Sequence, residues 1–123
     1  MNFKVESYDN YSIAKIEEEK LDSTLAPELK SEMLNLAQEG VKSLVIDMSP
    51  VKYVDSSGLS ALLVGNRSFS ETGAFVLFGI NDHVMKLIKI SQLDKVMNLV
   101  ASKEEAADLV FMTEIKKGQS APE

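Results

Sequence analysis

The sequence contains no cysteine, and no apolar run approaches the roughly 20 residues that cross a bilayer as a helix. Without cysteine, neither a disulfide framework nor a thiolate zinc site can form. The N-terminus also lacks the apolar segment that is typical of a secretory signal peptide. Together these absences indicate a cytoplasmic protein that does not insert into a membrane.

Positive charge is also scarce in this chain. It carries 13 lysine and arginine residues against 19 aspartate and glutamate residues, which gives a formal net charge of −6. This balance argues against general affinity for nucleic acid or for an anionic membrane, because both attract positive charge. It leaves the cationic surface of another protein as the more natural partner.

Motifs for catalysis, nucleotide binding and metal binding are missing. A serine hydrolase needs a base close to its nucleophile, but His83 is the single histidine and no Gly-x-Ser-x-Gly sequence is present. His83 follows Asp82, which is typical of an exposed residue at the start of a helix. The glycine-rich phosphate-binding motifs are absent, and no spacing of carboxylates singles out a metal site. We therefore predict a protein that is not an enzyme and that holds no cofactor and no metal.

The length of 123 residues predicts one domain that buries roughly two-thirds of its unfolded surface without cross-links. Alternating apolar residues predict two short strands, at residues 3–7 and 13–16, joined as a hairpin. Further strands are expected where apolar runs stand between polar segments, at residues 43–47, 75–78 and 96–100.

Helical spacing of apolar residues predicts four helices. Ser23 or Thr24 can cap the first helix, with Pro27 in its first turn and Gly40 at its end. The other three are expected over about residues 56–70, from about residue 82, and from Ser102 through about Met112.

The element order is therefore ββαβαβαβα. Strands that alternate with helices predict an α/β fold with a mostly parallel sheet, and the opening hairpin adds an antiparallel edge. We expect one folded domain over residues 1–113. The last residues lack apolar side chains, so residues 114–123 are expected to form a disordered tail.

Residues 55–58 read Asp-Ser-Ser-Gly and stand between an apolar strand and an apolar helix. Aspartate and serine are ordinary helix caps, so a purely structural role is one interpretation. However, one cap is sufficient and three candidates stand in a row. Gly58 also costs about 1 kcal/mol relative to alanine within a helix. A glycine there can mark a position where a partner approaches the backbone closely.

A serine at a helix N-terminus can carry a phosphate, because free N–H groups and the helix dipole stabilise negative charge. Phosphorylation would add a charge of roughly −1.5 to −2 at pH 7, and the fold should survive because the helix end can hold that charge. A partner packed against Ser56 would face repulsion from the phosphate and from the adjacent Asp55. The sequence therefore predicts a binding module that is switched by phosphorylation of Ser56.

These residues resemble the STAS domain family, and within it the stand-alone anti-sigma factor antagonists (anti-anti-sigma factors) of bacteria. The resemblance rests on the strand at residues 44–47, on the segments 51–54 and 55–59, and on the Leu-Asp pair at residues 21–22. Element order and length agree with that family from about residue 3 to residue 112. Glu19 stands where the family usually has glycine, which is a local departure before the first helix.

The resemblance implies an anti-sigma factor antagonist with a defined switch. In that family the unphosphorylated protein binds an anti-sigma factor that is also a serine kinase, and so frees a sigma factor for transcription. The kinase uses ATP to phosphorylate the serine after the aspartate, here Ser56, and a separate phosphatase resets it. Asp55 would orient the acceptor, and Gly58 would let the kinase approach. The implied partner-binding residues are Asp22, Ser23, Thr24, Asp55, Ser56, Ser57, Gly58 and Leu59.

Two other interpretations are open. Some STAS domains are regulatory or structural subunits of membrane transporters, including the soluble partner of a lipid-transport ABC complex. Residues 55–58 would then form a contact surface that need not be phosphorylated. The third interpretation is an enzyme of unrecognised type, although catalysis usually needs a positioned acid–base pair.

Overall fold

Five strands form the main sheet of the computed structural model, which describes residues 2–117. Their order across the sheet is β1-β2-β4-β6-β7. β1 and β2 pair antiparallel, and every later pair of neighbours is parallel. The predicted α/β fold, with a mostly parallel sheet and an N-terminal antiparallel hairpin, is confirmed. The strands are β1 (Phe3–Ser7), β2 (Ser12–Ile16), β4 (Leu44–Asp47), β6 (Phe75–Phe78) and β7 (Asn98–Val100).

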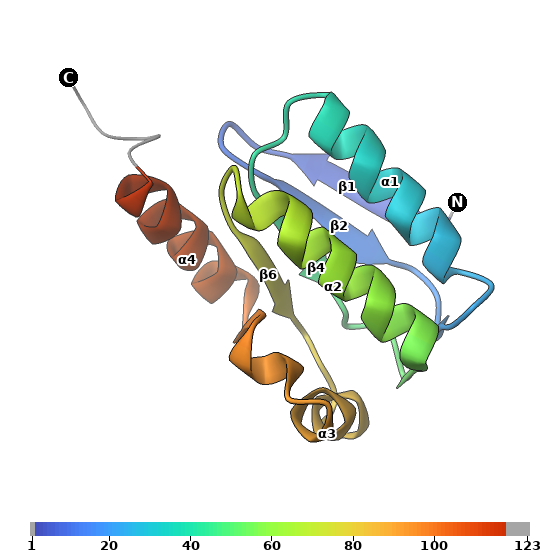
Figure 1. Ribbon diagram of the computed structural model, residues 1–123. Coiled ribbons are helices and arrows are strands. Elements are labelled where there is room, and N and C mark those ends of the chain that lie inside the picture. Colours follow the sequence, from blue (N-terminus) through green and yellow to red (C-terminus); the bar gives the residue numbers. More distant parts are fainter. Residues whose placement is uncertain (1, 118–123) are drawn as a thin grey trace.

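Helices cover both faces of this sheet. α1 and α2 lie side by side across one face (Figure 1), whereas α4 packs against the other. The bounds of α2 are those that its apolar spacing predicts. The helices are α1 (Ala26–Gln38), α2 (Ser56–Ser70), α3 (Asp82–Ile90) and α4 (Lys103–Lys116), with a short 3-10 helix, η1 (Leu93–Lys95), before β7.

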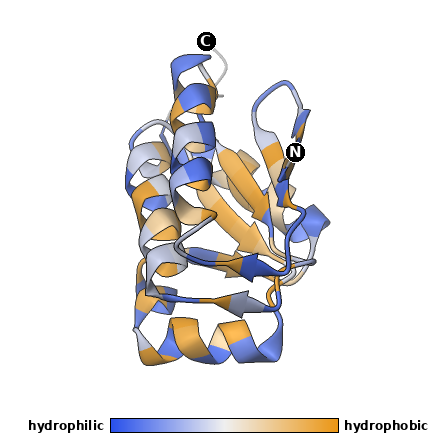
Figure 2. Ribbon diagram, turned by 90° about the vertical axis from the view of Figure 1, so that its right-hand side faces the viewer, coloured by the Kyte–Doolittle hydropathy of each residue, from blue (hydrophilic) through white to orange (hydrophobic). Residues whose placement is uncertain are grey.

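The central strand β4 is buried on both of its faces. Leu44 and Ile46 point into the larger core with α1 and α2, whereas Val45 points into a smaller core with α4. All three side chains are fully buried, as expected for a parallel strand with layers on both sides. Figure 2 shows apolar residues filling the central strands between the helices. The sheet is therefore a rigid base for the loops at its ends.

A second sheet of two very short strands joins two of those loops. β3 (Lys20–Leu21) and β5 (Tyr53–Val54) pair in parallel, with Leu21 opposite Val54. The sequence pattern did not predict these strands, because two residues are too few to show an alternation of apolar and polar positions. Their pairing places the turn after residue 21 beside the start of α2.

α1 begins later than its sequence predicts. The first helical residue is Ala26, and no side chain caps the helix, so the expected cap at Ser23 or Thr24 is wrong. The reason is Asp22, whose Oδ1 accepts hydrogen bonds from the N–H groups of Thr24 (3.0 Å) and Leu25 (3.3 Å). Asp22 therefore forms an Asx turn. This turn keeps residues 23–25 outside the helix.

α4 extends further than its sequence predicts. It ends at Lys116 rather than near Met112, so the expected tail boundary at residue 114 falls inside a helix. Glu114 is buried and accepts a hydrogen bond of 2.6 Å from the hydroxyl of Ser43. A buried charged residue cannot be recognised from the spacing of apolar residues. The spacing therefore predicts a helix that ends before Glu114. Residues 118–123 of the expected tail lie outside the described residues.

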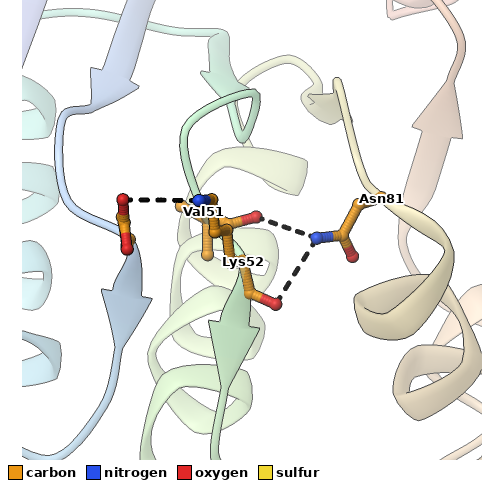
Figure 3. A network of polar contacts seen from close by, with 4 residues as sticks. Val51, Lys52 and Asn81 are labelled. Atoms are coloured by element: carbon orange, nitrogen blue, oxygen red, sulfur yellow. Dashed lines mark hydrogen bonds and ion pairs between the residues drawn. The ribbon is translucent and has the colours of Figure 1, made fainter.

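Asn81 links α3 to the loop before β5. Its Oδ1 caps α3 by accepting a hydrogen bond of 2.7 Å from the N–H of Val84. Its Nδ2 donates to the carbonyl oxygens of Val51 (3.3 Å) and Lys52 (3.4 Å), as Figure 3 shows. The N–H of Lys52 in turn donates to the carbonyl oxygen of Glu19 at 2.7 Å. Asn81 therefore connects α3 to the loop that leads into β5, and the backbone of Lys52 connects that loop to the one that leads into β3.

We predict that Asn81→Ala lowers the free energy of unfolding by about 1–2 kcal/mol, because it removes a helix cap and two further hydrogen bonds. Asn81→Asp keeps an oxygen in the cap position, so its loss should be smaller. Urea unfolding followed by circular dichroism measures both. Asn35→Ala, at an exposed position within α1, is the matched control and should show no loss. Equal stability of Asn81→Ala and Asn35→Ala would contradict the role given to Asn81.

Candidate functional site

Ser56 is the first residue of α2 and is exposed, while Ser57 is half-buried. Asp55 precedes them in an extended conformation, with φ −101° and ψ −174°, and its Oδ1 accepts a hydrogen bond of 2.9 Å from the N–H of Gly58. Its carbonyl oxygen accepts another, of 3.0 Å, from the N–H of Leu59. Asp55 is therefore the cap of α2, and capping requires neither serine hydroxyl.

The hydroxyl of Ser56 has no hydrogen-bond partner within residues 2–117. In any α-helix the first N–H groups have no acceptor within the helix, and here the N–H of Gly58 is already bonded to Asp55. The N–H groups of Ser56 and Ser57 remain at the end where the helix dipole is positive. This arrangement offers a free hydroxyl in a setting that suits an added negative charge.

The pairing of β3 with β5 brings a second turn to the same place. The N–H of Asp55 donates to the carbonyl oxygen of Leu21 at 3.2 Å, so the residues after both short strands are neighbours. Between the first turns of α1 and α2 lies an open depression of about 300 Å³. Its lining residues are Ser23, Ala26, Pro27, Lys30, Ser56, Ser57 and Ser60.

Residues predicted to bind a partner are divided between two neighbouring depressions. Ser23 lies in the depression with Ser56 and Ser57. Asp22 and Thr24, by contrast, line a neighbouring depression of about 480 Å³ whose other residues include Glu18, Glu19, Lys20 and Glu28. The turn after β3 therefore separates a hydroxyl-rich depression from an acidic one.

Gly58 has a structural role that the sequence analysis did not predict. It is buried, and a Cβ at this position would lie 2.3 Å from the carbonyl oxygen of Leu21 and 2.8 Å from Cγ1 of Val54. The close approach that requires glycine is thus made by this chain's own β3, and not by a partner. Leu59, the next residue, is half-buried and packs against the larger core. The structure therefore gives an internal reason for this glycine, and the approach of a kinase here stays a prediction.

Lys30 is a site residue that the sequence analysis missed. It faces the depression from α1, three residues after Pro27 and four after Ala26, a spacing that puts all three on one side of the helix. That spacing was readable in the sequence. The packing of α1 beside α2, which brings Lys30 to the serines, was not.

His83 does not line the depression beside Ser56. His83, on α3, packs edge-on against Tyr53 with ring centroids 5.8 Å apart, and both side chains are exposed. In the described part of the chain, no group of three or more histidine, cysteine, aspartate or glutamate residues is placed to hold a metal ion. The same residues contain no helix of the length and apolarity that a membrane crossing requires.

We predict that Gly58→Ala lowers the free energy of unfolding by about 1–3 kcal/mol, since the added methyl group collides with a backbone oxygen that cannot easily move. Thermal and urea unfolding provide the measurement, with Ser60→Ala, at an exposed position of the same helix, as the control. A Gly58→Ala protein of unchanged stability that fails to bind its partner would instead support the original expectation.

Comparisons with known proteins agree with this fold. The chain is similar to an anti-sigma-B factor antagonist of Staphylococcus aureus, with 23% identity over 80% of this chain and 92% of that protein. It also resembles the crystal structure of an anti-sigma factor antagonist from Mycobacterium paratuberculosis, with a TM-score of 0.80 and 24% identity over 89% of this chain and 92% of that one.

A third similar structure is that of the Bacillus cell fate determinant SpoIIAA in its phosphorylated form. Its TM-score is 0.66, with 21% identity over 86% of this chain and 96% of that one. The sequence model of the STAS domain family matches residues 2–106, which is most of the chain. The protein belongs to the STAS domain family.

Proposed function

We propose that this protein is an anti-sigma factor antagonist of the cytoplasm. Unphosphorylated, it binds an anti-sigma factor that is also an ATP-using serine kinase, and it thereby frees a sigma factor for transcription. Phosphorylation of Ser56 ends that binding, and a phosphatase restores it. The observation that carries the proposal is the exposed hydroxyl of Ser56, which lies at the start of α2 without an internal partner.

The fold supports a switch that works without refolding. The cap of α2 comes from Asp55, and the packing of α2 against β3 occurs at Gly58. Neither contact uses the side chain of Ser56, so a phosphate there changes the surface and leaves the core in place. A partner that fills the depression beside Ser56 would meet added bulk and a charge that is costly to desolvate.

The names of similar proteins support the same proposal. One is an antagonist of an anti-sigma factor in Staphylococcus aureus, and another was determined in a phosphorylated form. The partner surface that we propose consists of Ser23, Ser56 and Ser57, which line the depression, with the exposed Asp55 beside them and with Asp22 and Thr24 in the turn after β3. Gly58 is excluded because it is buried.

We predict that Ser56 is the residue that becomes phosphorylated. When the protein is incubated with the anti-sigma factor kinase of its host and ATP, mass mapping should place the phosphate on Ser56. Ser56→Ala should remain unmodified, whereas Ser57→Ala should be modified as the natural protein is. Label on Ser57, or on Ser56→Ala, would show that the acceptor is wrongly assigned.

Recovery of partners from the host distinguishes the proposal from its alternative. Affinity capture with and without phosphatase treatment should recover the kinase mainly from the dephosphorylated sample. Capture of a permease and its ATPase in both samples would instead identify a subunit of a membrane transporter, and would overturn the proposal.

We predict that Ser56→Asp folds normally but loses its partner. A loss of roughly 2–4 kcal/mol of binding free energy corresponds to about 30- to 1000-fold weaker binding. Isothermal titration with the purified partner measures the affinity, and thermal unfolding checks the fold. Ser68→Asp, at an exposed position near the other end of α2, adds the same charge away from the site and should bind as the natural protein does. A marked fall in the melting temperature of Ser56→Asp would contradict a mechanism confined to the surface.

A further inference from the structure

Lys30 is a positively charged side chain placed in the same depression as Ser56. The other lining residues are four serines, one alanine and one proline, none of which is charged. Lys30 is therefore the charged residue in the lining of this depression. The lysine is exposed, and within residues 2–117 it forms no ion pair. Lys52, on the loop before β5, differs in this respect, because its Nζ lies 3.5 Å from a carboxylate oxygen of Glu19.

The carboxylates of Asp55 and Asp22, in the two turns beside Ser56, accept hydrogen bonds from backbone N–H groups and do not line this depression. Asp55 accepts from the N–H of Gly58 at 2.9 Å, and Asp22 accepts from the N–H groups of Thr24 and Leu25. Asp22 also lines the other, acidic depression. An anion on Ser56 would therefore share its depression with one lysine and several hydroxyls.

We propose that Lys30 is the intramolecular counter-ion of a phosphate carried by Ser56. This inference rests on the proposed phosphorylation of Ser56 and adds how the modified state is held. The ion pair joins α1 to α2 across the depression. It stabilises the dianion, and it withdraws from any partner the cation that this surface presents in the unphosphorylated protein.

The test installs phosphoserine at position 56 during translation, by an expanded genetic code, so that it needs neither the kinase nor the partner. Phosphorus NMR then follows the second ionisation of the phosphate as a function of pH. A nearby positive charge favours the dianion, so the pKa of the phosphate should be higher in Lys30→Met than in the natural sequence, by about half a pH unit. Lys30→Arg keeps the charge and should keep the lower pKa.

Lys86→Met, at an exposed position on α3, removes an equal charge elsewhere and should leave the phosphate pKa unchanged. Circular dichroism verifies that each variant is folded. The same pKa in Lys30→Met and in the natural sequence overturns the proposal, as does an equal rise in Lys86→Met. Neither result bears on whether a kinase selects Ser56, so failure of this inference and failure of the proposed function can be told apart.

Discussion

The contact of Gly58 with the carbonyl of Leu21 is the constraint on which the site depends. Only a residue without a side chain lets the first turn of α2 approach β3 so closely, because a Cβ would lie 2.3 Å from that oxygen. The approach keeps β3 paired with β5 and holds the turn after β3 beside Ser56. Without it, the two loops would be joined only by the short β3–β5 pairing and a few backbone hydrogen bonds, since β3 and β5 are only two residues long.

A division of roles between adjacent residues follows from this constraint. Asp55 caps α2, and Gly58 lets α2 pack against β3. The side chain of Ser56, which lies between them, takes part in neither contact. If a serine had been the cap, phosphorylating it would have removed a hydrogen bond that the helix needs. Because the cap is an aspartate, the hydroxyl can change its chemistry while the helix keeps its start.

The sequence predicts those parts of the fold whose signal lies within one element. The hairpin, the buried strand β4 and the bounds of α2 follow from local periodicity and are confirmed. The failures involve contacts between elements. Asp22 holds residues 23–25 outside α1 through backbone bonds, and Glu114 is buried because Ser43 donates to it. At the site, the sequence indicates that something lies close to the backbone of Gly58. It does not indicate whether that neighbour is β3 or a partner protein.

The charge of the protein raises a question that the depression helps to answer. A chain with a net charge of −6 suits a cationic partner, and an added phosphate would by itself increase that attraction. Release therefore has to come from a local effect and not from total charge. The hydroxyl-rich depression next to Ser56 is small, about 300 Å³, so a phosphate occupies space that a partner side chain would need. An ion pair with Lys30 would weaken the local field of the phosphate at short range but would leave the added net charge unchanged, because Lys30 is already counted in the charge of −6. Under the proposed function, occupation of the depression would then be the physical basis of the switch.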